Sequence, residues 1–478
     1  MRVQEVSTLQ NRDTCLPAHV LHVHYTKPMR FRLLALILLL CMVLPGAETT
    51  NKKIFPLPYD QHDFPNGLRL VTVPTSYPNV VALYIVVRTG SRNEIEPGKS
   101  GFAHLFEHMM FRGTKQFPTE KYEATMREAG AASNAFTSDD LTAYHTTFSK
   151  EDLETMLRVE ADRFQSLEYS PDVFKTETLA VLGEYNKNSA SPMSKLNETM
   201  RNTAFDKHTY KHTTMGFLED VKNMPHLFDY SREFFNRYYK PEYTTLLVVG
   251  DVTPQQTKAL VEKYWGGWKR GNYKPEIPVE PKQTEARTAH VNWPSPTLPW
   301  VYVGFKSAPY SDSAKDSAAL DLISFLGFSE SSDLYQRLVI QQQKTDAFGA
   351  SNPDHVDPYL FTVVARVKKE ADMKDVEDQI LATLATFKDT LVSQEKLNTV
   401  KQHLRYSFAL GMNNSEAIAG NLAHYIALGG TPETLNRLYE VYDKLTPEDL
   451  REVARKYFTA ENRTIVTLTG ASAVKKSN

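Results

Sequence analysis

An internal repeat restricts the folds open to this chain more than any other feature of its sequence. Residues 237–247 align without a gap on residues 456–466, at an offset of 219 positions. The same offset places 148–150 over 367–369, and each of these short segments is expected to close a strand and open a long helix. Because two agreements at one offset indicate duplication, the sequence predicts two copies of one fold in a single chain.

Hydrophobic periodicity outlines the elements of each half. Strands are expected over 67–73, 80–87, 132–137, 142–148 and 244–250, and then over 300–305, 348–351 and 359–367. Helices are expected from about Phe102, and over 121–129, 151–167, 172–188 and 254–264. This mixture predicts an α+β fold of two homologous α/β sandwich domains, each a mainly antiparallel sheet with helices on one face. We expect the first domain at 55–270, the second at 286–470, and the Pro- and charge-rich stretch 271–285 as their linker.

The segment His104-Leu105-Phe106-Glu107-His108 carries the predicted chemistry. Two histidines four positions apart on a helix project about 40° from each other, and the glutamate between them falls on the same arc. Zinc takes imidazole nitrogen and carboxylate oxygen, and a catalytic site keeps three protein ligands so that the fourth position can hold a reactive water. We expect His104, His108 and a distant Glu184 to bind Zn²⁺, and Glu107 to accept the water proton as general base, in the order H-x-x-E-H.

The third ligand is expected on a second helix. Ser170 precedes Pro171, and this pair is typical of an N-cap followed by the first helical position. Glu177 and Glu184 lie seven residues apart and therefore on one face of that helix. A solvated acidic stripe is the alternative for such a pair. Together with the histidines, however, the spacing favours Glu184 as the third ligand and Glu177 as a carboxylate that orients a ligand or the water.

These features resemble the insulinase or pitrilysin-like zinc peptidases, the inverzincins. The resemblance rests on the H-x-x-E-H segment, on its spacing to the two glutamates, and on the segments 130–137, 239–242 and 246–251. The resemblance covers about residues 55–470. Within the family, the chain is similar to the short-subunit branch, which includes mitochondrial processing peptidase and many bacterial periplasmic members. The resemblance implies that the two domains form one half-shell, and that this half-shell pairs with another in a homodimer or a heterodimer.

The resemblance also implies a substrate site. In the family, the strand corresponding to 132–137 lies at a sheet edge beside the zinc, where an extended peptide can add as a further strand. Asn134, Ala135 and Phe136 are therefore candidate substrate-binding residues, and an ordinary packed hairpin is the alternative. Active single-chain relatives carry an arginine and, seven residues later, a tyrosine that contact substrate.

This chain departs from that pattern in its second half. Arg337 is followed at the same distance by Lys344, and Asp333 stands where relatives often have arginine. The departure implies that a partner subunit supplies the missing groups. At the offset of 219, the three H-x-x-E-H positions correspond to Ile323, Leu326 and Gly327, so the second half cannot bind a metal in the same way.

The N-terminal residues 1–47 are expected to be a leader. Residues 29–32 carry two arginines and precede the apolar run 33–44, which is the pattern of a secretory signal. A run of about twelve residues is too short for a stable transmembrane anchor, although an uncleaved anchor is the alternative. The sequence therefore predicts an exported protein, periplasmic or secreted, with no stable membrane span in the mature chain.

Cysteine usage agrees with this leader. Cys41 invites a lipoprotein interpretation, but the bulky Leu40 before it argues against lipidation. Cys15 and Cys41 are the only cysteines. The mature chain would then contain neither disulfides nor thiolate ligands.

Other patterns exclude or weaken further functions. The net charge of −2 and the absence of basic clusters in the sequence argue against a nucleic-acid partner. His208 and His212 have ligand-like spacing, but they stand in a Lys- and Thr-rich segment without a suitable glutamate, and a solvated loop is expected there.

The sequence thus predicts a zinc metalloendopeptidase that hydrolyses peptides or unfolded segments inside a closed chamber. The alternative function is a non-catalytic scaffold or a partner subunit of a heterodimeric peptidase. Scaffold members of the family typically lose the metal triplet, whereas this chain keeps it.

Overall fold

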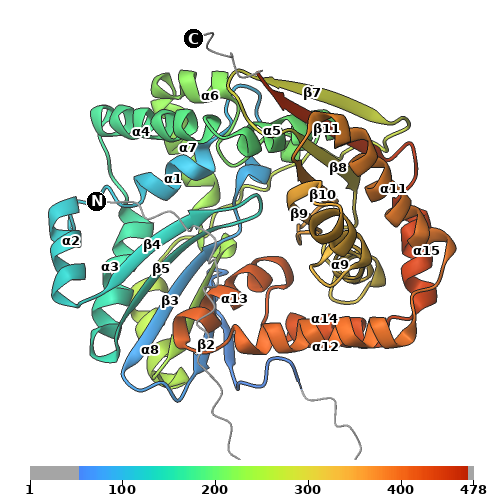
Figure 1. Ribbon diagram of the computed structural model, residues 1–478. Helices are drawn as coiled ribbons and strands as arrows, with labels where there is room; N and C mark the ends of the chain where they lie inside the picture. Colours follow the sequence, from blue (N-terminus) through green and yellow to red (C-terminus); the bar gives the residue numbers. More distant parts are fainter. Residues whose placement is uncertain (1–52, 472–478) are drawn as a thin grey trace, which may run out of the picture. The chain divides into compact units, whose positions relative to one another are not determined.

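The first half of the chain folds around a six-stranded sheet. The computed structural model describes residues 53–471, and Figure 1 shows their elements. The strands are β1 (Asp60–Asp63), β2 (Arg69–Pro74), β3 (Val80–Val87), β4 (Ala132–Thr137), β5 (Thr142–Ser149) and β6 (Thr244–Gly250). Their order across the sheet is β1-β2-β6-β3-β5-β4, and only the β2–β6 pair is parallel. Among the strands of residues 53–471, β4 pairs with β5 alone and is therefore an edge strand.

The second half builds a five-stranded sheet with the same connectivity. Its strands are β7 (Arg287–Trp293), β8 (Trp300–Lys306), β9 (Thr345–Ser351), β10 (Leu360–Val367) and β11 (Arg463–Gly470). The order is β7-β11-β8-β10-β9, and only β7–β11 is parallel. If β7, β11, β8, β10 and β9 are matched with β2, β6, β3, β5 and β4, the order and every direction agree. The predicted duplication and the predicted fold class are therefore confirmed.

The helices of each half follow the same plan. The first half contains α1 (Phe102–Met109), α2 (Thr119–Glu128), α3 (Leu153–Ser166), α4 (Pro171–Ser189), α5 (Pro192–Ala204), α6 (Leu218–Asn223), α7 (Phe228–Tyr238) and α8 (Pro254–Trp265). The second half contains α9 (Lys315–Phe328), α10 (Asp333–Tyr335), α11 (Met373–Asp389), α12 (Gln394–Leu410), α13 (Ser415–Gly429), α14 (Glu433–Lys444) and α15 (Pro447–Tyr457). The repeat offset superimposes α7 on α15 and β6 on β11 residue by residue.

Strand β3 shows how the sheets are covered. Its sequence is a continuous apolar run rather than an alternating one, which is typical of a strand buried on both faces. Val81, Leu83 and Ile85 point into a core shared with α1, α3 and α4. Ala82 and Tyr84 point into a different core, which contains residues of the second half. Helices of both halves therefore contribute to the packing of this sheet.

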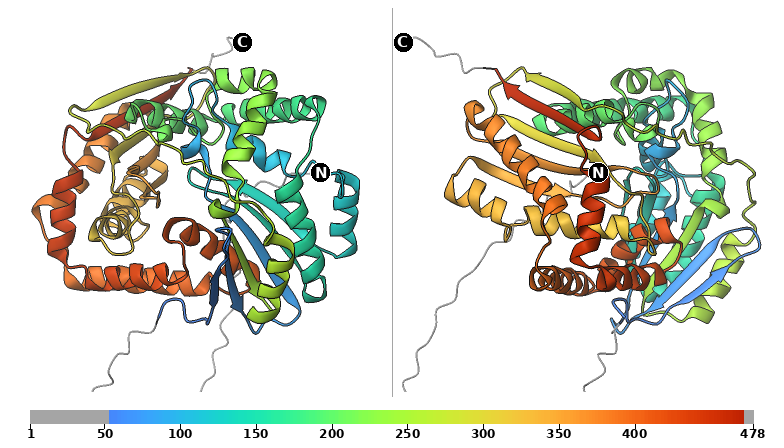
Figure 2. Two further views of the ribbon diagram at one scale, coloured as in Figure 1. Left: turned by 180° about the vertical axis from the view of Figure 1, so that it is seen from behind. Right: turned by 90° about the vertical axis from the view of Figure 1, so that its right-hand side faces the viewer.

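The two halves exchange one helix each. Helix α13 of the second half packs against β3 and β6 of the first sheet, and α5 of the first half packs against β7, β8 and β11 of the second sheet. Figure 2 gives two further views of this arrangement. The prediction placed helices on one face of each sheet, and the structure adds a helix from the other half on the opposite face. Since α5 and α13 occupy corresponding places in the repeat, the exchange is reciprocal.

The predictions on the leader, on a membrane span and on the linker concern the N-terminal region and the connection between the halves. The expected leader, residues 1–47 with both cysteines, lies outside the described residues. Within 53–471, no helix is both long and apolar enough to cross a bilayer. The stretch 271–285 runs between β6–α8 and β7 without a helix or strand, as a linker would. The domain boundaries at 55–270 and 286–470 remain a prediction.

Candidate metal centre

Helix α1 is positioned at its N-terminus by a buried glutamate. Gly101 precedes the helix with a φ of 96°, a left-handed conformation that favours glycine. The backbone amides of Gly101 and Ala103 each donate a 2.7 Å hydrogen bond to the carboxylate of Glu94. Burial raises the pKa of Glu94 to about 8, although the two amides act in the opposite direction. The side chain satisfies donors that a helix start leaves unpaired, and it fixes the start of the helix that carries the two histidines.

Helices α1 and α4 bring the three predicted ligands together. Nε2 of His104 lies 3.2 Å from Oε2 of Glu184, and Nε2 of His108 lies 3.7 Å from the same oxygen. One ligand atom from each residue can be chosen so that all lie within 4.8 Å of one another. Hydrogen bonds from the two histidines are the main cause of a lowered pKa at Glu184.

The geometry of these donors fits zinc. Ligands that lie about 2.0–2.1 Å from zinc at tetrahedral angles are about 3.3 Å apart. The two histidine–Glu184 separations, 3.2 and 3.7 Å, lie near this value, and all three ligand atoms lie within 4.8 Å of one another. Two imidazoles and one carboxylate also match the donor set that zinc prefers. Among residues 53–471, this is the only group of three or more His, Cys, Asp or Glu side chains close enough to share one ion.

Glu177 contacts the outer nitrogen of His108. Oε2 of Glu177 lies 3.8 Å from Nδ1 of His108, and Arg112 holds the carboxylate through its Nε at 2.8 Å and a terminal nitrogen at 3.0 Å. Burial raises the pKa of Glu177, but the neighbouring His108 and Arg112 outweigh this effect and lower it. The contact leaves Nε2 of His108 directed at Glu184, as expected for a carboxylate that orients a ligand.

Arg112 was not predicted from the sequence. It follows the second histidine by four residues and lies just past the end of α1, so no helical spacing pointed to it. Nδ1 of His104 is buried and has no hydrogen-bond partner within the described part of the chain. Of the two histidines, only His108 therefore has a carboxylate beside its Nδ1 in this part of the chain.

Glu107 contacts the edge strand of the first sheet. The hydroxyl of Thr137, the last residue of β4, donates a 2.7 Å hydrogen bond to Oε2 of Glu107. Helix α1 and β4 lie side by side, as Figure 1 shows. The predicted base, the predicted ligands and the free edge of β4 are therefore neighbours.

The three candidate substrate residues face different ways along β4. Ala135 is buried, whereas Asn134 is exposed and Phe136 keeps 39% of its surface exposed. In register, Asn134 opposes His145 on β5. No strand in the described part of the chain pairs with the other side of β4. A substrate role for these residues stays a prediction.

The expectation of a solvated loop around His208 and His212 is wrong. Both side chains are buried, with 3% and 4% of their surface exposed. Nε2 of His208 donates to Asp357 of the second half at 3.0 Å, while Nδ1 of His212 contacts the carbonyl of Thr213 at 3.0 Å. Burial lowers the pKa of His212 to about 4. Because Asp357 lies far away in sequence, local composition could not reveal the burial.

Within the described residues, the place in the second half that corresponds to the H-x-x-E-H segment holds no set of metal ligands. Ile323 and Gly327 are buried on α9, and Leu326 packs against the core. Lys344, at the position where the resemblance implied a tyrosine, pairs with Asp375 at 2.7 Å. Asp333 is mostly exposed and lies 3.3 Å from Lys396.

Comparisons with known proteins assign the chain to a family. The model described as "Insulinase (Peptidase family M16)" matches residues 69–217, and the model described as "Peptidase M16 inactive domain" matches 228–404. The zinc protease PqqE of Helicobacter pylori is 31% identical over 444 residues, which covers 91% of this chain and 98% of that protein. The chain belongs to the insulinase, or M16, family of peptidases. The resemblance stated from the sequence is confirmed.

Solved structures of the M16 family share the fold. A protease from Helicobacter pylori matches with a TM-score of 0.80 and 30% identity, over 86% of this chain and 99% of that one. The periplasmic protease PqqL from Escherichia coli matches with a TM-score of 0.70 and 21% identity, over 87% of this chain and 48% of that one. A probable mitochondrial-processing peptidase subunit beta of Arabidopsis thaliana is 24% identical, over 82% of this chain and 75% of that protein. Relatives named as zinc proteases support a peptidase role and zinc as the metal.

Proposed function

We propose that this M16 chain is a zinc-dependent endopeptidase. The observation that carries the proposal is the convergence of His104, His108 and Glu184 within 4.8 Å, with Glu107 on the same helix turn. The M16 relatives named as zinc proteases support the same assignment. His104, His108 and Glu184 would hold the ion, and Glu107 would be the general base.

The residues around the proposed metal site have different roles in hydrolysis. When bound, zinc would polarise the scissile carbonyl and the attacking water. Glu107 takes a proton from that water and later passes it to the leaving amine. Thr137 holds one carboxylate oxygen of Glu107, so the other oxygen remains available for the proton. Glu177, held by Arg112, keeps the ring of His108 in its ligating orientation.

The free edge of β4 is the proposed substrate rail. An extended peptide that adds to this edge gains backbone hydrogen bonds along Asn134, Ala135 and Phe136. Such recognition depends little on side-chain identity, which suits a peptidase acting on peptides or unfolded segments. It also places the bound peptide beside Thr137 and therefore beside Glu107.

We also propose that the chain works in a closed chamber with a second subunit. Lys344 stands in place of the tyrosine and is paired with Asp375, so it leaves the substrate-contacting pair incomplete. A homodimer or a heterodimer with a related subunit would complete the chamber, and the relative named as a processing peptidase subunit supports pairing. Export to the periplasm or the medium is proposed from the leader pattern and from the periplasmic relative PqqL.

Cleavage of a mixed peptide library tests the proposed function. The chain is assayed alone and together with a related M16 subunit from the same genome. In at least one of these states it is expected to cleave peptides, to lose this activity with a zinc chelator and to regain it with added zinc. A chain that binds zinc but cleaves nothing in either state would support the alternative, a non-catalytic partner subunit. Cleavage that persists after complete removal of the metal would overturn the proposal.

A further inference from the structure

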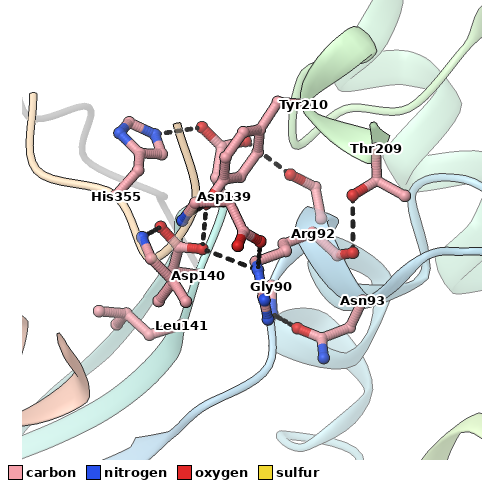
Figure 3. Close-up of polar contacts among 12 residues, drawn as sticks. Gly90, Arg92, Asn93, Asp139, Asp140, Leu141, Thr209, Tyr210 and His355 are labelled. Atoms are coloured by element: carbon pink, nitrogen blue, oxygen red, sulfur yellow. Dashed lines mark hydrogen bonds and ion pairs between the residues drawn. The ribbon is translucent and has the colours of Figure 1, made fainter. Parts of the chain in front are cut away.

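Two equivalent turns, one from each half, meet between the sheets. The turn 138–141 joins β4 to β5, and residues 352–358 lie in the loop between β9 and β10, its counterpart in the repeat. Figure 3 shows the polar contacts around the first of these turns. Because β4 is the edge strand that carries Thr137, whatever fixes this turn also fixes one end of β4.

Asp139 connects the turn to helix α5 of the first half and to one loop of the second half. Its Oδ1 accepts hydrogen bonds at 2.6 Å from Ser91 and from Arg201 of α5, the helix that packs on the second sheet. Its Oδ2 accepts a 3.0 Å hydrogen bond from Nε2 of His355 in the loop 352–358. The carboxylate therefore has partners on both oxygens, in a site where its side chain is only 11% exposed.

Asp140 makes a second connection in parallel. Its Oδ1 accepts a 2.7 Å hydrogen bond from the hydroxyl of Tyr210. Its Oδ2 accepts a 3.2 Å hydrogen bond from the backbone amide of Val356. Two adjacent side chains of the turn thus bind two adjacent residues of the opposite loop. Buried carboxylates need such partners, because an unpaired charge in this position would be costly.

The backbone of the turn is also held closely. The amide of Arg92 donates to the carbonyl of Asp139 at 2.8 Å. A Cβ on Gly90 would lie 2.3 Å from the carbonyl oxygen of Ser138, so only glycine allows this approach.

The loop 352–358 is in turn anchored on the second half. The side-chain amide of Asn352 donates to Asp321 on α9 at 2.8 Å, and the ring of His355 stacks on Tyr359 at 3.8 Å. Helix α9 is the counterpart of the metal-carrying helix α1. The contacts therefore form a continuous path from α9 through the loop and the turn to β4.

We infer that Asp139 and Asp140 are positioning residues, through which the second half holds the edge strand and the Thr137–Glu107 hydrogen bond in place. The inference deepens the proposed function and rests on it for its effect on turnover. Only Ser138 separates Thr137 from Asp139, so a shift of the turn is passed almost fully to the hydroxyl that contacts Glu107. The half without a metal motif would thus control the geometry of the base in the other half.

The test removes the contact from the second half and leaves the catalytic residues untouched. His355→Ala deletes the bond to Asp139, and His355→Gln can restore a donor at a similar reach. Arg287→Gln is the matched control, because Arg287 of β7 binds Asp206 and the carbonyl of Ala204, a contact between the halves that does not touch β4. Asp139→Asn serves as a second disrupting variant if His355→Ala fails to fold.

Two measurements report on the strand and on the chemistry separately. Amide hydrogen exchange of 132–141 follows the strand in zinc-free protein, and kcat and KM follow turnover in zinc-loaded protein. We expect His355→Ala to speed exchange in 132–141 at least tenfold and to lower kcat by about 10- to 100-fold, the cost of an ångström-scale misplacement. Zinc stoichiometry should not change. His355→Gln should restore most of the slow exchange in 132–141 and most of the kcat, and Arg287→Gln should resemble the wild type in both measurements.

Each outcome bears on the inference. Unchanged amide exchange in 132–141 for both disrupting variants would overturn the inference. A loss of kcat in Arg287→Gln as large as that in His355→Ala would also overturn it. Faster exchange of 132–141 in a chain whose wild type cleaves no peptide would support the positioning role and reject the proposed function, so the two failures are distinguishable.

Discussion

The hydroxyl of Thr137 donates a 2.7 Å hydrogen bond to Oε2 of Glu107, and this bond joins the edge strand β4 to the metal helix α1. In the proposed mechanism, the strand that aligns the substrate thereby also orients the base. Peptide alignment and proton transfer share one rigid connection.

Replacement of Thr137 by valine should lower kcat by about 10- to 100-fold, because the carboxylate of Glu107 loses the bond that orients it. KM and zinc stoichiometry should change little, since no ligand is affected. Thr137→Ser keeps the hydroxyl and is the matched control. Steady-state kinetics on one cleaved peptide provide the measurement, and wild-type kcat in Thr137→Val would refute the role of this bond.

Replacement of Glu177 by glutamine should weaken zinc binding by about 10- to 100-fold, as is usual for the loss of a carboxylate that orients a metal-binding histidine. Arg112→Gln should weaken it in the same direction, because Arg112 fixes the carboxylate. Asp172→Asn removes a carboxylate from the first turn of the same helix and should leave zinc affinity unchanged. Competition with a chromophoric chelator gives the affinities, and equal affinity in Glu177→Gln and the wild type would count against this orientation.

Glu94 is expected to stabilise the fold through the start of α1. Glu94→Ala leaves the amides of Gly101 and Ala103 buried without their acceptor, which should cost about 1–3 kcal/mol of unfolding free energy for the lost partner. Glu233→Ala, which removes a largely exposed ion pair with Arg237, should cost about 0–1 kcal/mol. Denaturant unfolding of both variants makes the comparison. Similar losses in the two would show that Glu94 does not cap the helix.

Asp357 should make stability depend on pH in the acid range. Burial raises its pKa, but hydrogen bonds from His208 and Arg92 outweigh this and lower the pKa to about 2. A carboxyl group with a pKa lowered by folding stabilises the fold above its unfolded pKa of about 3.9 and loses this contribution as the pH falls below that value. The wild type should therefore lose unfolding free energy faster than Asp357→Asn between about pH 4 and pH 2. Unfolding curves recorded across this window test the sign, and parallel curves would contradict it.

Local sequence patterns sufficed for much of the fold, because they depend on neighbouring residues. The strands 80–87, 132–137 and 244–250 and the start of α1 were predicted at their observed positions, and Ser170 caps α4 by accepting the amide of Val173. The repeat then gave the second half, whose own signals are weaker.

Features that arise from tertiary contacts were not predicted. The sequences of α5 and α13 show apolar residues but do not indicate that each helix packs on the sheet of the other half. His208 was expected to be solvated because its partner, Asp357, comes from the other half. Arg112 and Glu94 act through residues distant from them in the sequence or on another turn, so no local pattern marked them.

The central claim is that His104, His108 and Glu184 hold one zinc ion while Glu107 transfers the proton. Its most direct test measures zinc content and turnover of the wild type and of Glu107→Gln in parallel. We expect one zinc per chain in both proteins and a loss of turnover of about 10²- to 10⁴-fold in the variant, the usual contribution of general acid–base catalysis. Wild-type turnover in a zinc-loaded Glu107→Gln protein would contradict the account.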